Sequence, residues 1–245
     1  MTLRPSLAAA TALLASAALL APAAADAAPK RRSLRFAVTL ELTRTFATTL
    51  TPAAPLAGCS DAFDPPVEGT TQQRETIRPL RRTVLAYVYT DLRYGAPIVS
   101  GPSLQAGRGE SVPIVATVQR SADVREEPPC DFGIPDDAPP RPAQIACLGT
   151  TTTEITDNAL TLGVTLRGFV LRLPYTGGCA DREDLFPTLA SDPEFRLDFA
   201  TLRAAKRPVV RRLSSQRDCS LRETAYAARC RATVAGTLTL TRLRG

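Results

Sequence analysis

The chain has 245 residues, a formal net charge of +6 and no histidine. Without histidine it cannot hold a Ser-His-Asp or Cys-His catalytic couple, or a zinc ion bound through imidazole. Only Lys30 and Lys206 among the 30 basic residues are lysines, which also disfavours a lysine nucleophile. The positive charge suits weak attraction to anionic envelope polymers or acidic lipids, although charged residues also serve simply to solvate a secreted domain.

A secretory signal is predicted for residues 1–28, where Arg4 precedes an apolar run from Leu7 to Leu20 and small residues follow up to Ala28. The apolar run is too short to span a bilayer, and no later segment has the roughly 20 apolar residues that a transmembrane helix needs. We therefore expect an exported protein, secreted or associated with the cell envelope, with no transmembrane segment and no nucleic-acid partner. The excess of Arg over Lys, together with many Ala, Thr and Pro, is typical of a high-GC bacterium.

Alternating apolar and polar residues predict β-strands along most of the remaining chain. In chain order, the candidate strands are residues 34–43, 83–89, 111–119, 160–173, 195–199, 209–213 and 232–241. In the longest candidate the apolar positions change from even to odd numbers, which predicts a β-bulge near Gly168. Gly236 in the last strand indicates either a bulge or a close approach of another group. Helical patterns are weak, with two short candidates at Asp181–Leu189 and Leu221–Ala228.

Two proline-rich segments, residues 51–66 and 128–142, are predicted to be surface loops. The second is also a candidate linker between a first β unit, residues 29–127, and a second β unit, residues 143–245. A weak repeat supports this division, because Gly58-Cys-Ser-Asp61 recurs as Gly178-Cys-Ala-Asp181.

Six cysteines follow the signal, and their pairing is the next prediction. They stand at positions 59, 130, 147, 179, 219 and 230, and none has the CxxC spacing of a redox motif or a zinc ribbon. Disulfides are therefore expected, in an oxidising compartment. Of the 15 pairings that six cysteines allow, we predict Cys59–Cys179, Cys130–Cys147 and Cys219–Cys230. No metal ion and no cofactor is expected.

These elements predict an all-β, disulfide-stapled β-sandwich of immunoglobulin-like or jelly-roll type. The length fits either one large sandwich or two smaller ones, and we favour two related β units packed or bridged together.

Two sets of side chains are candidates for binding. Tyr87 and Tyr89 point to the same face of their strand and resemble a stacking platform for sugar rings, although a position at the rim of the core explains them equally well. Arg207 and Arg211 share a strand face and are candidates for weak contacts with an anionic ligand. The alternative is a solvated edge strand on which arginine prevents aggregation.

Catalysis without histidine would depend on paired carboxylates about 5–10 Å apart. The candidate clusters are Glu126 with Glu127, Asp136 with Asp137, Asp181 with Glu183 and Asp184, and Asp192 with Glu194. All lie in predicted loops, where solvated charge is the ordinary explanation, and the spacing around Asp181 matches no known calcium loop. We therefore expect a non-catalytic exported protein that binds an envelope polymer or an extracellular protein. The alternative is a histidine-independent hydrolase acting on an envelope polysaccharide.

Overall fold

The computed structural model describes most of the chain that follows the predicted signal. The described residues are 30–56, 58–61, 65–93, 96–106, 112–130, 137–156, 160–173, 179, 182, 185–186, 194–219 and 226–244. The predicted signal at residues 1–28 lies outside this part of the chain.

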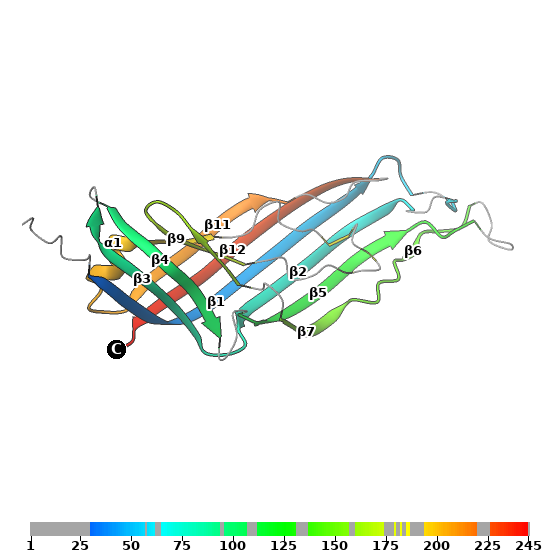
Figure 1. The fold of residues 1–245 in the computed structure, drawn as a ribbon. Coiled ribbons are helices and arrows are strands. Elements are labelled where there is room, and N and C mark those ends of the chain that lie inside the picture. The colour runs from blue at the N-terminus through cyan, green and yellow to red at the C-terminus, as the bar shows by residue number, and fades with distance from the viewer. Residues whose placement is uncertain are drawn as a thin grey trace, which may run out of the picture.

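Nearly all of the described structure is antiparallel β-strand, which confirms the predicted all-β, sandwich-like class (Figure 1). The strands of the main sheet are β1 (Arg31–Pro52), β2 (Val67–Pro79), β3 (Thr83–Arg93), β4 (Ala96–Ala106), β5 (Ile114–Glu126), β6 (Arg141–Pro142), β7 (Gly149–Ile155), β11 (Val209–Asp218) and β12 (Tyr226–Arg242). They follow the order β11-β12-β1-β2-β5-β6, with β3 paired to β1 and β4, and β7 paired to β5.

A smaller sheet has the order β10-β9-β8. It consists of β8 (Thr161–Val164), β9 (Gly168–Arg172) and β10 (Glu194–Asp198), and a single short helix, α1 (Phe199–Ala204), follows directly. Asp198 caps α1, because its side chain accepts a hydrogen bond from the backbone N–H of Thr201 at 3.0 Å. The choice between an immunoglobulin-like and a jelly-roll topology remains a prediction.

β1 is the central strand of the main sheet. It continues for 22 residues and pairs with β12 along one side. Along its other side it pairs first with β3 and then with β2. Even-numbered side chains from Leu34 to Leu50 are buried while most odd-numbered ones are exposed or half-buried, as the period of two requires. One face of the main sheet is therefore the inner face.

The core lies between the inner face of the main sheet and the small sheet. Its larger cluster includes Phe36 and Leu238 of the main sheet and Phe169 and Phe195 of the small sheet. Gly236 is a position of close approach: a Cβ there would lie 3.2 Å from Cζ of Phe195 and 2.5 Å from Cδ1 of Leu42. The pairing of β12 with both neighbours continues through Gly236 without a shift, so the close approach is confirmed and the bulge is not.

The prediction of one continuous, bulged strand at residues 160–173 is wrong. The segment is a hairpin, in which β8 and β9 pair antiparallel around the turn Thr165-Leu166-Arg167. The backbone N–H of Thr165 donates to the Gly168 carbonyl at 2.8 Å, and the Gly168 N–H donates to the Thr165 hydroxyl at 3.0 Å. The apolar phase changes because the chain reverses direction, not because a strand bulges. A Cβ on Gly168 would lie 1.9 Å from the Leu197 carbonyl oxygen, so this position needs glycine.

Two of the three predicted disulfides are wrong. The structure joins Cys59 to Cys130, Cys147 to Cys179 and Cys219 to Cys230, so only Cys219–Cys230 is confirmed and both Cys59–Cys179 and Cys130–Cys147 are contradicted. The reason is the pairing of β2 with β5, which continues into the loops. There Ser60 N–H donates to the Pro128 carbonyl at 2.8 Å, and the Cα atoms of Cys59 and Cys130 lie 4.9 Å apart.

Strands from both predicted β units belong to one sheet. β1, from the first unit, pairs with β12, from the second, over 17 residue pairs, and the larger core cluster contains side chains from both units. The boundary at residues 128–142 stays a prediction, although the strands on its two sides are not separated in space. The helix predicted at Leu221–Ala228 is wrong for its described residues, because β12 begins at Tyr226.

Candidate functional site

Tyr87 and Tyr89 lie inside the core, where only 1% and 8% of their surfaces are exposed. The ring of Tyr87 packs edge-on against Phe169 with centroids 5.0 Å apart, and Cζ of Arg203 lies 5.7 Å from the centroid of Tyr89. Burial raises the pKa of Tyr87 far above its ordinary value, which keeps its hydroxyl protonated. A stacking platform needs an exposed ring face, so the prediction of a sugar platform at these tyrosines is wrong and the core position is correct.

Arg207 and Arg211 have different environments, and their joint role in binding stays a prediction. Arg207 precedes β11 and is exposed, whereas Arg211 lies within β11 and is half-buried, with its Nη1 donating to the Val210 carbonyl at 3.3 Å. β11 lies at the end of the strand order of the main sheet, where its partner among the described strands is β12. The predicted edge strand rich in arginine is therefore present. Arg207 lies just before this strand, and Arg211 lies within it.

A hollow of about 720 Å³ lies where the beginning of β1 meets the end of β12 and the segment after α1. We call it the basic hollow and define it by its cationic lining residues Arg35, Lys206, Arg242 and Arg244. The Leu243 N–H donates to the Arg35 carbonyl at 2.8 Å and so continues the pairing of β1 with β12 beyond the end of the strand. This contact holds cationic side chains from both ends of the described chain around one concavity.

The charges of the basic hollow are exposed and of one sign. All four cationic side chains are exposed, and the other lining residues are Ser33, Leu34, Ala205 and Leu243, without a carboxylate. None of the four cations forms an ion pair with a carboxylate in the described part of the chain. Like charges grouped around a concave surface raise the local concentration of anions, and salt screens this effect.

A second hollow, of about 720 Å³, lies against the small sheet, and we call it the hairpin groove. Its charged lining residues are Arg167, Arg172, Arg196, Arg211, Glu194 and Asp198. Here part of the charge is internally balanced, because Nε of Arg172 lies 2.7 Å from Oε1 of Glu194, and Asp198 caps α1. The hairpin groove is therefore less cationic than the basic hollow.

A third polar feature is buried. On the inner face of β1, Arg44 and Thr48 lie between Leu42 and Leu50, and the core is divided there into the larger cluster and a smaller one. Arg44 lies directly opposite Glu75 on β2, with Nε 2.7 Å from Oε2 and about 3% of either side chain exposed. We call the buried residues Arg44, Thr48, Thr71, Gln73, Glu75 and Arg120 the polar band.

Hydrogen bonds connect the polar band across three strands. Nε2 of Gln73 donates to Oε1 of Glu75 at 2.6 Å, and Nε of Arg120 on β5 donates to Oε1 of Gln73 at 2.8 Å. With the pair of Arg44 and Glu75, these contacts form one chain from β1 through β2 to β5. Buried charges of this kind are tolerated only when their partners are in place.

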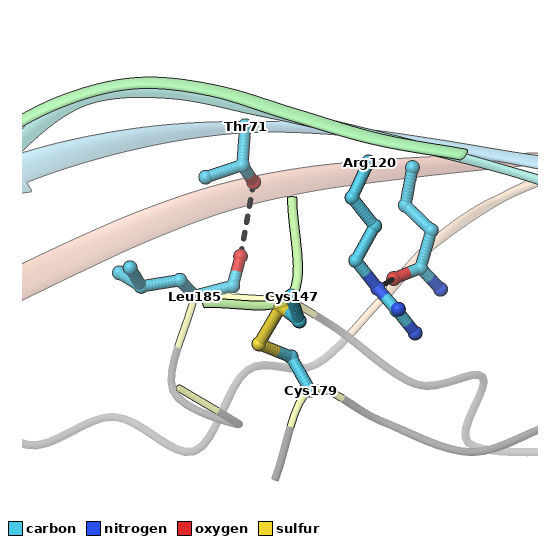
Figure 2. Close-up of a disulfide and its surroundings, with 6 residues drawn as sticks. Thr71, Arg120, Cys147, Cys179 and Leu185 are labelled. Atoms are coloured by element: carbon cyan, nitrogen blue, oxygen red, sulfur yellow. Dashed lines mark hydrogen bonds between the residues drawn. A yellow bond between two sulfur atoms is a disulfide. The ribbon is translucent and has the colours of Figure 1, made fainter. Parts of the chain in front are cut away.

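A covering segment, which we define by its described residues Cys179, Arg182, Leu185 and Phe186, contacts the sheet at the polar band (Figure 2). The Thr71 hydroxyl donates to the Leu185 carbonyl at 2.9 Å, next to the bridge between Cys147 and Cys179. Nη1 of Arg182 donates to Oε2 of Glu126 at 2.9 Å, and Cζ of Arg120 lies 5.7 Å from the ring centroid of Phe186. The polar band is thus covered, and its contacts hold the segment on the sheet.

The buried carboxylates in the described part of the chain contact arginines. In the described part of the chain the buried carboxylates are Glu75, beside Arg44, and Glu126, beside Arg182 and Arg141. Of the acidic residues singled out for catalysis, Asp136, Asp181, Glu183, Asp184 and Asp192 lie outside the described residues. Within the described ranges, no group of three or more His, Cys, Asp or Glu side chains is placed to hold a metal ion.

Neither the length of the helices nor the comparison with known proteins indicates a function. No helix among the described elements is long and apolar enough to cross a bilayer. The chain matches no protein-family model, no curated protein and no solved structure. Function must therefore be argued from the surfaces of this chain. Of the four predicted binding residues, Arg211 lines the hairpin groove. The sequence analysis did not select Arg35, Arg242 or Arg244 of the basic hollow for binding.

Proposed function

We propose that this protein is an exported, non-catalytic protein of the cell envelope or extracellular space that binds an anionic envelope polymer through the basic hollow. The observation that carries the proposal is the lining of that hollow, in which four exposed cations meet without a carboxylate. A phosphate- or carboxylate-bearing polymer is the matching ligand, because it presents charges at regular intervals to several cations at once.

The chemistry of the chain supports the proposed location. Three disulfides within the described residues are typical of proteins that fold in an oxidising compartment. The predicted signal at residues 1–28 favours export. An exported protein encounters envelope polymers before most other polyanions, which makes nucleic acid a less suitable ligand.

The hydrolase alternative has less support. A glycosidase needs two carboxylates across a cleft, whereas Glu75, Glu126 and Glu194 each contact arginine. In the hairpin groove Glu194 contacts Arg172 and Asp198 caps α1, and the basic hollow has no carboxylate in its lining. The same binding experiment can still detect an enzyme if soluble product is measured.

The test compares two triple variants that remove equal charge. Arg35→Gln, Arg242→Gln and Arg244→Gln change the basic hollow, while Arg78→Gln, Arg229→Gln and Arg231→Gln change exposed arginines elsewhere. Co-sedimentation of the oxidised mature protein with a poly(glycerol phosphate) wall polymer is measured, with a neutral polysaccharide as the second ligand.

We expect the hollow variant to lose affinity for the anionic polymer by about tenfold, since three exposed charge contacts of about 0.5 kcal/mol each sum to about 1.5 kcal/mol. The matched variant should change by less than about twofold. Equal losses in both variants would contradict a defined site, and release of soluble fragments would replace binding by hydrolysis as the function.

A further inference from the structure

The tip of the β8–β9 hairpin carries an apolar side chain almost entirely in water. Leu166 is 95% exposed and Val164, at the end of β8, is 51% exposed. β8 contacts β4, on which Ile98 is 49% exposed. Single exposed leucines are common, but Val164 and Leu166 stand two positions apart on one hairpin, so its tip exposes two large apolar side chains together.

Arginines border this apolar tip. Arg167 follows Leu166 directly, and Arg172, Arg196 and Arg211 line the groove below it. With Glu194 and Asp198 counted, the groove carries four positive and two negative charges, a difference of +2. The wall between them is apolar and includes Phe169, Val170 and Leu197. Long arginine side chains can keep their charged ends at a polar boundary while an apolar neighbour enters a less polar phase.

We propose that the β8–β9 hairpin docks on an anionic lipid surface, with Leu166 inserted among the lipids and the groove arginines at the level of the headgroup phosphates. The charge complementarity favours anionic over zwitterionic lipid, and each basic residue near such a surface contributes about 1 kcal/mol. Burial of Leu166 adds an apolar contribution that charge alone does not supply. This inference goes beyond the proposed polymer binding and does not depend on it.

The arrangement of the molecule is compatible with this docking. β9, α1 and the C-terminal end of the chain lie at the same end of the elongated main sheet (Figure 1). The basic hollow includes Lys206, just after α1, and Arg244 near the C-terminal end, so it belongs to that end as well. One end of the molecule thus presents both cationic surfaces and the apolar tip.

The absence of tryptophan from the chain allows a direct test of insertion. Leu166→Trp gives the protein a single tryptophan at the hairpin tip, and Leu148→Trp places one at another exposed leucine, 40% exposed, as the matched control. Emission is recorded with vesicles of phosphatidylglycerol and of phosphatidylcholine, with and without brominated acyl chains.

We expect the Leu166→Trp emission to shift to shorter wavelength and to be quenched by brominated phosphatidylglycerol, with no change for Leu148→Trp or with phosphatidylcholine. No shift, or an equal shift in both variants, would overturn the proposal. A shift produced by a monomeric anionic amphiphile but not by vesicles would also overturn it, because the groove would then bind a single molecule.

A second pair of variants keeps the surface free of tryptophan. Leu166→Ser should lower retention on phosphatidylglycerol vesicles by at least about fivefold, and Leu148→Ser should leave it unchanged. Equal retention of Leu166→Ser and the wild type would overturn the proposal. Binding of the wall polymer should be normal in Leu166→Ser, so a failure of lipid docking is separable from a failure of the proposed polymer site.

Discussion

The basic hollow and the polar band use arginine in opposite ways. In the polar band, Arg44 is buried beside Glu75, and Arg120 donates a hydrogen bond to Gln73. In the basic hollow, Arg35 and Arg242 are exposed and face no carboxylate among the lining residues. A buried charge whose partner is removed costs several kcal/mol, whereas an exposed charge contributes little to folding and stays available to a ligand. The buried arginines are therefore expected to matter for stability, and the exposed ones support the proposed binding role.

The largest effect is expected at the buried ion pair. Arg44→Met leaves the Glu75 carboxylate buried without its cation and should lower the free energy of unfolding by about 3–5 kcal/mol. Arg35→Met, on the same strand but exposed, should change it by less than about 0.5 kcal/mol. Urea unfolding followed by circular dichroism measures both, and similar losses would break the comparison.

A double variant that removes both Arg44 and Glu75 separates the effect of charge from the effect of packing. Arg44→Met combined with Glu75→Leu should recover much of the lost stability, because no buried charge then lacks a partner. No recovery in the double variant would mean that the loss comes from packing around Arg44 instead of from charge.

The next effect is expected at the disulfide beside the polar band. Replacing Cys147 and Cys179 together by serine removes a bridge between residues 32 apart in sequence and should lower the free energy of unfolding by about 3 kcal/mol. Binding of the wall polymer at the basic hollow should be retained under folding conditions. Loss of polymer binding in a variant that is still folded would show that the two regions are coupled.

A smaller effect is expected at the hydrogen bond to the covering segment. Thr71→Val removes the donor to the Leu185 carbonyl and should cost about 1 kcal/mol. Thr70→Val, the exposed neighbour on the same strand, should be nearly neutral. Hydrogen exchange measures the difference in stability between the two variants. If the disulfide alone holds the covering segment on the sheet, the two variants should exchange at the same rate.

The smallest effect is expected at the surface pair in the hairpin groove. The side chains of Arg172 and Glu194 are 54% and 30% exposed, so Arg172→Gln should cost less than about 1 kcal/mol. The difference from wild type should vanish in high salt. If the loss of stability persists in high salt, Arg172 and Glu194 behave as a buried ion pair, which would contradict this prediction.

Sequence periodicity predicted several strands with clear apolar alternation and missed β2, β4 and β7. β1, β3, β5 and β12 contain clear alternation within their bounds. β2 was missed because three of its inner side chains are Thr71, Gln73 and Glu75, which look like solvent-facing residues in the sequence. The sequence of β1 contained a signal for the polar band. Arg44 stands at an even-numbered position, and the other even-numbered side chains of this strand are largely apolar and buried.

The basic hollow was not predictable because its residues are distant in sequence. Arg35 and Arg242 come together only through the pairing of the first long strand with the last. The disulfide pairs failed for the same reason: they depend on the register of β2 with β5, and a short sequence repeat was weaker evidence than that pairing. Local patterns determine strands, whereas sites built from several strands need the topology.

The most direct measurement is a salt titration of binding to the anionic wall polymer for the wild type and the two triple variants. If the exposed arginines of the basic hollow form the site, the variant with Arg35→Gln, Arg242→Gln and Arg244→Gln binds more weakly and with a shallower dependence of affinity on salt. The variant with Arg78→Gln, Arg229→Gln and Arg231→Gln then keeps the wild-type dependence. Identical salt dependence in all three proteins would contradict the assignment of binding to the basic hollow.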